Sequence, residues 1–288
     1  MEIIKPVFIV GTGRCGSTAF HRRFVRHPEA AFLSALLEKY PQRPYLNSWL
    51  MRALDIPALA PAARKVLPSE CWNFWDMYGI SGVCRDLVAE DVTPSMKERL
   101  RELLSRFLTG RRNRLLIKLS GWPRTGYFRE IFPDARFIHI IRDGRAVANS
   151  LLNIGWWQGW KGPEKWGFGP LPGKYRQEWE SYNRSFAALA GIEWKILMDS
   201  FREASAGLGQ SDYLEVRYED LCRDPAGKFR ETADFCGFSF TERFESEIKS
   251  FLPLENRNFK WRQQLTPDQQ RVLSELLRDH LELYGYLD

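Results

Sequence analysis

Residues 8–20, FIVGTGRCGSTAF, constrain the fold more than any other stretch of the chain. An apolar run leads into a loop with three glycines, and a helical pattern begins directly after it. A strand, a glycine-rich loop and a helix in this order present backbone N–H groups and the positive end of the helix dipole, which together bind anions. The plainer alternative is a tight turn that needs glycine only for its tolerance of positive φ.

Two familiar nucleotide-binding templates nearly fit this loop. Its glycines satisfy the dinucleotide spacing G-x-G-x-x-G, but that site also needs an acidic residue about twenty positions later, at the end of a second strand. Residues 27–41, HPEAAFLSALLEKYP, show no clear strand of that kind. The P-loop that binds ATP or GTP needs a lysine where Ser17 stands, and the basic residue here is Arg14 instead. Both templates are therefore disfavoured.

The rest of the chain alternates between strand and helix patterns. Short apolar runs, typical of strands covered on both faces, occur at residues 7–10, 114–119, 136–141 and 213–218. Helical patterns occur at residues 93–108, 175–206, 224–238 and 266–286. We expect 175–206 to be one helix, with any kink near Gly191. The alternation predicts an α/β fold of three layers, with a central parallel sheet between helices.

Composition narrows the range of partners. The chain carries 42 Lys and Arg against 36 Asp and Glu, a formal charge of +6 that favours anionic partners. The cations are spread along the chain, so we expect no nucleic acid partner. Five cysteines without a C-x-x-C pair and four scattered histidines predict a reducing compartment and no zinc site. Neither a signal peptide nor a membrane-length apolar run is present, so we expect a cytoplasmic protein with no transmembrane segment.

The position of the basic residue in GTGRCGST, residues 11–18, is informative. The segment resembles the 5′-phosphosulfate loop of the sulfotransferase family, usually Lys or Arg followed by Ser-Gly-Thr-Thr. The donor of that family is 3′-phosphoadenosine 5′-phosphosulfate (PAPS). The resemblance implies a P-loop-like fold whose donor-binding loop consists of Gly13, Arg14, Cys15, Gly16, Ser17 and Thr18.

A second segment strengthens the resemblance. RFIHIIRDGRAVANSLL, residues 136–152, is similar to the family's 3′-phosphate motif, in which a strand ends at an Arg and the next helix carries a Ser eight residues later. Arg142 and Ser150 have that spacing. An Arg at the carboxyl edge of a sheet and a hydroxyl on the following helix can reach one phosphate. Taken alone, either residue could equally be a surface group in an ion pair or in water.

Two later segments offer weaker candidates. RYEDLCRDPAGKFRETADFCGF, residues 217–238, resembles a late strand and helix of the family, and in several members the corresponding Tyr lies near the adenine. Tyr218 is therefore a candidate, with a half-buried strand Tyr as the alternative. Basic NRNFKWRQ, residues 256–263, falls where the family often adds 3′-phosphate contacts. Arg257 and Lys260 are candidates there, although the usual Arg-Lys-Gly is missing.

The resemblance implies in-line transfer of a sulfuryl group from PAPS to a hydroxyl or amine of a small molecule, sugar or lipid. PAP is then the product, and no metal is expected. Cations and amides around the leaving phosphate supply most of the catalysis, by analogy with phosphoryl transfer. We expect Arg14 to stabilise that phosphate. Lys118, at the end of a predicted strand, resembles a family lysine that points at the sulfuryl group, and a lysine that only extends to solvent is the alternative.

The general base is harder to identify. One branch of the family has Lys-Thr-His at this strand end, whereas this chain has Lys-Leu-Ser at 118–120. Glu70, in PSECWNFWDMY, lies among aromatic residues that could raise its pKa and shape a pocket. Glu38 is the alternative base. His139 lies inside a buried strand, where we expect a structural imidazole.

We interpret residues 1–288 as one sulfotransferase domain, with insertions on the acceptor side near 36–95 and 155–175. The second insertion contains a loop, 155–173, of a length that is often found in lids and binding loops. Two alternatives stay open: a P-loop nucleotide kinase or NTPase, and a non-catalytic protein of the same fold that binds PAP or another anion. The acceptor pocket is expected to draw on Trp72, Trp75, Trp156, Trp157, Trp160 and Trp166.

Overall fold

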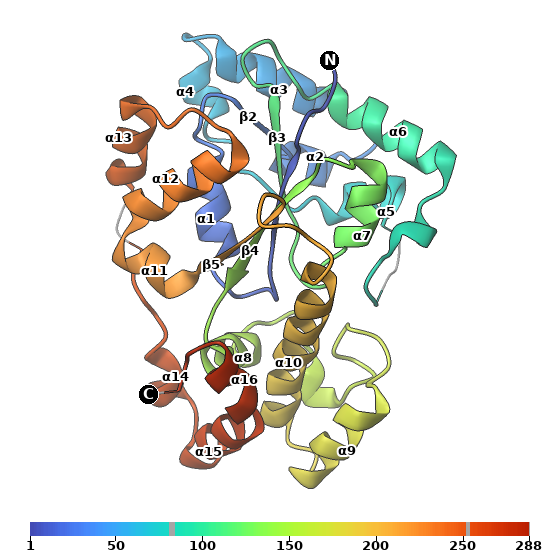
Figure 1. Ribbon diagram of the computed structural model, residues 1–288, viewed down its shortest axis with the longest axis vertical. Helices are drawn as coiled ribbons and strands as arrows, with labels where there is room; N and C mark the ends of the chain where they lie inside the picture. The colour runs from blue at the N-terminus through green and yellow to red at the C-terminus, as the bar shows by residue number, and fades with distance from the viewer. Residues whose placement is uncertain (81–83, 252–253, 288) are drawn as a thin grey trace.

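The computed structural model describes residues 1–80, 84–251 and 254–287. Within them, parallel strands form one five-stranded sheet in the order β2-β3-β1-β4-β5 (Figure 1). The strands are β1 (Val7–Val10), β2 (Ala30–Phe32), β3 (Arg114–Lys118), β4 (Arg136–Ile141) and β5 (Tyr213–Arg217). The predicted parallel α/β fold and all four predicted strands are confirmed. β2 was not predicted, because a strand of three residues is too short to show a pattern of its own.

The order of the strands places three chain segments at one edge of the sheet. β1 lies between β3 and β4, so the strand order reverses around it. Ile9 of β1 pairs with Lys118 of β3, and Val10 pairs with His139 of β4. Ligands of open α/β sheets bind at such a reversal, beyond the carboxyl ends of the strands. The loop after β1, the end of β3 and the residues after β4 therefore meet there.

Helices cover both faces of the sheet. On one face, Phe8 stacks on Phe128 of α7, and His139 stacks on Phe201 of α10. On the other face, Phe20 of α1 stacks on Phe229 of α12. The helices are α1 (Ser17–Phe24), α2 (Ala35–Lys39), α3 (Tyr45–Asp55), α4 (Ala60–Ala63), α5 (Trp72–Tyr78), α6 (Pro94–Ser105), α7 (Thr125–Ile131), α8 (Gly144–Leu152), α9 (Gly173–Ser181), α10 (Phe186–Ser205), α11 (Tyr218–Arg223), α12 (Pro225–Cys236), α13 (Glu242–Ser250), α14 (Lys260–Gln264), α15 (Pro267–Leu276) and α16 (Arg278–Leu283).

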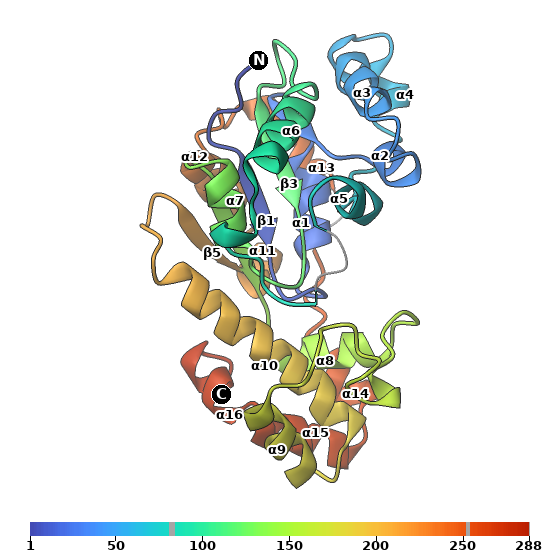
Figure 2. The same ribbon diagram turned by 90° about the vertical axis from the view of Figure 1, so that its right-hand side faces the viewer.

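A second core lies below the sheet in Figure 1, between α8, α10 and the C-terminal helices. α10 runs from this helical part to the sheet (Figure 2). The prediction of one domain over 1–288 stays a prediction. No helix in the described ranges has the length and apolar character that crossing a membrane requires.

Two predicted helices are broken in the structure. The stretch 175–206 is wrong as one helix, because α9 ends at Ser181 and α10 begins at Phe186. Asn183 and Arg184 adopt left-handed backbone angles, with φ of 52° and 56°, and so end the helical run. The C-terminal pattern at 266–286 likewise divides into α15 and α16. The predicted helices at 93–108 and 224–238 are confirmed as α6 and α12.

Candidate active site

The loop after β1 is shaped by left-handed residues. Gly13, Arg14 and Gly16 have φ of 78°, 54° and 95°. A Cβ on Gly16 would lie 2.5 Å from Cδ2 of Tyr218, so only glycine fits there. α1 begins at the next residue, Ser17, and no side chain among the described residues caps it. Its first N–H groups therefore remain available to an anion at the positive end of the helix.

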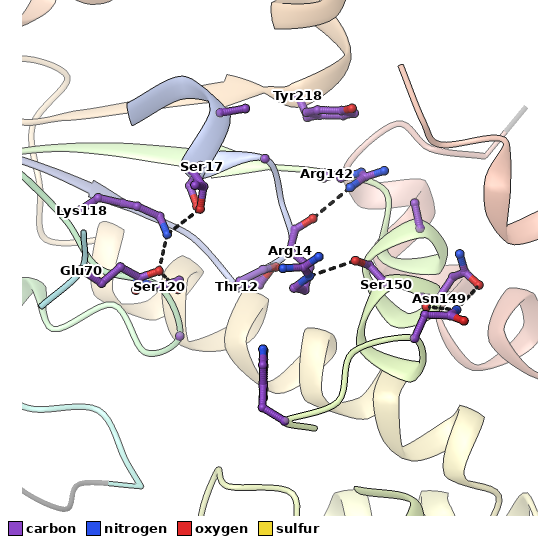
Figure 3. Close-up of a pocket in the computed structure, with 18 of the residues that line it drawn as sticks. Thr12, Arg14, Ser17, Glu70, Lys118, Ser120, Arg142, Asn149, Ser150 and Tyr218 are labelled. Carbon is purple, nitrogen blue, oxygen red and sulfur yellow. Dashed lines mark hydrogen bonds and ion pairs between the residues drawn. The ribbon is translucent and has the colours of Figure 1, made fainter. Parts of the chain in front are cut away.

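Two arginines lie close together at this loop, Arg14 within it and Arg142 after β4 (Figure 3). Nε of Arg14 donates to Oγ of Ser150 over 2.9 Å, and Nη1 of Arg142 donates to the Arg14 carbonyl over 2.9 Å. Nε of Arg142 donates to Oδ1 of Asn258 over 2.8 Å. The guanidinium of Arg142 also lies 4.3 Å from the ring centre of Tyr218. The predicted pair Arg142 and Ser150 is thus brought together, with Arg14 between them.

The positive charges of Arg14 and Arg142 favour the binding of an anion at this place. Burial and then the neighbouring charge of Arg142 lower the pKa of Arg14. Within the described part of the chain, neither arginine pairs with a carboxylate. Two guanidinium groups at one place, next to an uncapped helix start, fit a ligand with several negative charges. The predicted role of Arg14 at the leaving 5′-phosphate stays a prediction; in this structure Nε of Arg14 is bonded to Ser150, one of the residues predicted to hold the 3′-phosphate.

A second cluster lies at the end of β3 (Figure 3). Nζ of Lys118 donates to Oγ1 of Thr18 over 3.0 Å and forms an ion pair with Glu70. The backbone N–H of Ser120 donates to Oε2 of Glu70 over 2.8 Å, and its hydroxyl donates to the same oxygen over 2.8 Å. Lys118 is almost fully buried, and the side chain of Glu70 retains 20% of its exposure. A carboxylate, an ammonium and two hydroxyls therefore converge beside the loop.

The ionisation of Glu70 differs from the expectation. Burial alone would raise its pKa, but the charge of Lys118 and the hydrogen bonds from Ser120 outweigh burial and hold the pKa below its usual value. The expected upward shift from aromatic neighbours is wrong. Glu70 is accordingly a carboxylate at neutral pH.

Most of the predicted site residues line one cavity of about 1570 Å³. This volume exceeds that of ordinary small-molecule pockets, so it can hold a nucleotide and a second substrate together. The predicted residues that line it are Gly13, Arg14, Gly16, Ser17, Thr18, Glu70, Lys118, Arg142, Ser150, Tyr218, Arg257 and Lys260.

Three residues considered in the sequence analysis do not line this cavity. Cys15 is fully buried, and its sulfur packs against Gly11, so its side chain cannot contact a ligand in the cavity. Glu38 interacts with Ser69 and Asn73 outside the cavity lining. His139 is buried, with Nδ1 2.7 Å from the hydroxyl of Tyr213, which confirms its structural role.

Aromatic side chains form much of the remaining wall. Of the predicted tryptophans, Trp72, Trp156 and Trp166 line the cavity. Trp75 and Trp157 are buried in the cores, and Trp160 is exposed, so these three are wrong as pocket residues within the described structure. Trp122 and Phe168 were not predicted and complete this wall, which we call the aromatic wall.

Ser120 and Asn258 are the polar residues that sequence reasoning missed. Ser120 follows Lys118 by two positions, where alternation in the extended chain turns it to the same side, so its spacing was a usable signal. Asn258 lies between the two basic residues proposed in NRNFKWRQ, and no sequence signal marked the amide rather than the cations. Arg257 instead pairs with Glu255.

The chain is similar to known sulfotransferases. The model of the sulfotransferase family matches residues 6–242. The omega-hydroxy-beta-dihydromenaquinone-9 sulfotransferases Stf3 of Mycobacterium bovis and Mycobacterium tuberculosis are 24% identical over 315 residues, covering 98% of this chain and 75% of the relative.

Among solved structures, sulfotransferase STF9 from Mycobacterium avium has a TM-score of 0.60 at 16% identity, covering 98% of this chain and 77% of that one. Sulfotransferase STF1 from Mycobacterium tuberculosis has a TM-score of 0.53 at 18% identity, with coverage of 95% and 76%. Both share the fold. The family match displaces the kinase or NTPase alternative. The chain belongs to the sulfotransferase family, which confirms the enzyme class and the PAPS donor that its two phosphate motifs predicted.

Proposed function

We propose that this sulfotransferase transfers the sulfuryl group to a hydroxyl carried by a hydrophobic, lipid-like molecule, with Glu70 as the general base. The observation that carries the proposal is the ion pair of the Glu70 carboxylate with Lys118, beside the phosphate loop and in the cavity that the aromatic wall also lines. A base must reach both the donor side and the acceptor side of the reaction. Glu164 and Glu255 also line the cavity, but Glu70 is the glutamate that pairs with Lys118 beside the phosphate loop.

The donor site is assigned from the two clusters. The N–H groups of α1 with Ser17 and Thr18 would hold the 5′-phosphosulfate, and Arg142 with Ser150 would hold the 3′-phosphate. Arg14 uses one N–H on Ser150, which leaves its terminal nitrogens for phosphate oxygens of either group. The bound donor supplies an activated sulfuryl group and a phosphate that leaves with negative charge. As the resemblance to the family implies, we propose transfer without a metal.

Glu70 and Lys118 have separate roles in the transfer: Glu70 accepts a proton, and Lys118 stabilises negative charge. Ser120 fixes the carboxylate, and Glu70 accepts the hydroxyl proton of the acceptor on one of its oxygens. Lys118 carries a positive charge between Glu70 and Thr18, next to the place where negative charge leaves. As the ammonium turns toward that charge, the carboxylate loses its main stabilising partner and becomes a stronger base.

Two observations favour a hydrophobic acceptor over a sugar. The aromatic wall provides flat apolar surface in the same cavity, which suits a hydrocarbon or a ring. The Stf3 relatives are named for a hydroxylated menaquinone, a molecule of this kind. Small phenols and sugars remain the competing acceptors in the test. Loop 155–173 contributes Trp156 and Trp166 to the wall, which supports its proposed role as a lid.

The test measures transfer of labelled sulfuryl groups from PAPS to a panel of long-chain alcohols, phenols and sugars. We expect product with the long-chain alcohols. Glu70→Gln should lower kcat at least about a hundredfold, the usual contribution of a general base, while PAP affinity stays within about threefold. Glu38→Gln is the matched control and should retain wild-type turnover. Full activity of Glu70→Gln contradicts the assignment of the base, and transfer to sugars alone contradicts the acceptor class.

We also propose that the enzyme works in the cytoplasm. All five cysteines are free thiols in the structure, and three of them are buried in its cores, which supports a reducing compartment.

A further inference from the structure

The segment from Arg43 to Leu67 forms a layer on one side of the molecule, which we call the α3–α4 layer. Figure 2 shows α3 and α4 projecting at the upper right, away from the sheet, with α2 and α5 below them. Asn47, Met51 and Leu54 are buried on the inner face of α3 and anchor the layer. The outer face is free to meet a partner.

That outer face is unusually apolar. Residues 56–62, IPALAPA, contain no polar side chain, and six of the seven are exposed. Ile56 and Leu59 keep 47% and 49% of their exposure, and Trp49 on the outer face of α3 keeps 60%. Contiguous exposed apolar residues of this size mark an interaction site.

The same layer carries uncompensated positive charge. Arg43, Arg52 and Lys65 are exposed, and none pairs with a carboxylate among the residues with described structure. The sole acidic residue in the layer's sequence is Asp55, which pairs with Arg112. A surface with exposed Trp, Ile and Leu between cations matches the interface of an anionic bilayer, where apolar side chains insert and cations meet headgroups.

We propose that the α3–α4 layer docks on the surface of an anionic phospholipid bilayer. Charge complementarity selects this occupant, because a second copy of the chain would bring the same cations face to face. The docking itself does not depend on the proposed function.

The layer adjoins the active site. The chain passes from exposed Leu67 to Glu70 in three residues, which span at most about 10 Å. A smaller cavity of about 320 Å³ lies between α1 and the layer and shares Arg22 and Arg23 with the main cavity. Leu67 and this smaller cavity therefore connect the layer to the cavity that contains Glu70.

The experiment is flotation of the full chain with phosphatidylcholine vesicles, with or without phosphatidylglycerol. We expect binding to the anionic vesicles that weakens with added salt. The double variants Ile56→Ser/Leu59→Ser and Arg52→Glu/Lys65→Glu should each weaken binding at least about tenfold. Their matched controls are Leu283→Ser and Arg278→Glu, exposed residues on α16, which should bind like wild type. Unchanged PAP affinity verifies that each variant is folded.

Three results would overturn the proposal. The first is no vesicle binding by the wild type, and the second is equal binding by wild type and the α3–α4 variants. The third is self-association in sedimentation that Ile56→Ser/Leu59→Ser abolishes, without vesicle binding, which assigns the layer to a dimer interface. Because flotation needs neither PAPS nor turnover, its outcome is independent of the sulfation assay.

Discussion

Replacing Arg142 with alanine tests the donor site at its most constrained position. The side chain is 9% exposed and donates to Asn258 and to the Arg14 carbonyl. A guanidinium has five N–H donors, so three remain for a ligand. Arg142 therefore has the geometry to bind a phosphate with more than one N–H while its own position stays fixed.

The expected magnitude follows from these contacts. A hydrogen bond to a charged group contributes about 1.5–3 kcal/mol, which corresponds to about tenfold to 150-fold in affinity. Arg142→Ala should weaken binding of PAP by that factor. AMP lacks the 3′-phosphate and should lose much less. The substitution also leaves the Arg14 carbonyl and the Tyr218 ring without a partner, so the informative quantity is the ratio of the PAP and AMP affinities.

Calorimetric titration of wild type and variant with both nucleotides measures this ratio. Asn258→Ala is the matched control, because it removes a partner of Arg142 but keeps the cation. We expect its ratio to stay within about threefold of wild type. Equal losses of PAP and AMP affinity in Arg142→Ala would refute the assignment of the 3′-phosphate to this residue.

Two further predictions concern stability. Gly16→Ala should lower the free energy of unfolding by about 1–2 kcal/mol from the left-handed backbone alone, and more from the contact with Tyr218. Gly207→Ala, where a methyl meets open space, is the control in thermal unfolding, and equal melting temperatures for the two variants contradict the packing described here. Glu193 is buried, and desolvation raises its pKa from 4.5 to about 8. The unfolded chain therefore ionises first as pH rises, and Glu193 lowers the free energy of unfolding between about pH 4.5 and 8. Glu193→Gln should raise the melting temperature more at pH 8 than at pH 5, and an equal change at both pH values argues against this shift.

The sequence predicted the sheet well where strands are buried on both faces. The apolar runs at β1, β3 and β4 are continuous because helices cover both sides of them. β2 is short and is held by its pairing with β3, a long-range contact that no local pattern reports. The break between α9 and α10 was missed because it depends on left-handed angles at Asn183 and Arg184, which the amphipathic pattern does not record.

The site was predictable to the extent that its residues follow one another in the chain. Arg142 and Ser150 are fixed by one strand and one helix, so their spacing sufficed. Glu70 and Lys118 are 48 positions apart, and their ion pair depends on how the segment that carries Glu70 packs against β3. The sign of the pKa shift of Glu70 depends on that packing too, since a neighbouring lysine reverses the effect of burial. The burial of Cys15 under the loop likewise needed the tertiary structure.

Calorimetric titration of the wild-type protein with PAP, AMP, ATP and NAD, with and without magnesium, tests the central claim most directly. The claim is that the loop after β1 and Arg142 together bind a nucleotide with both a 5′- and a 3′-phosphate. We predict tight binding of PAP that does not depend on magnesium, and much weaker binding of the other three. Preference for ATP with magnesium, or for NAD, would contradict the assignment of the donor site.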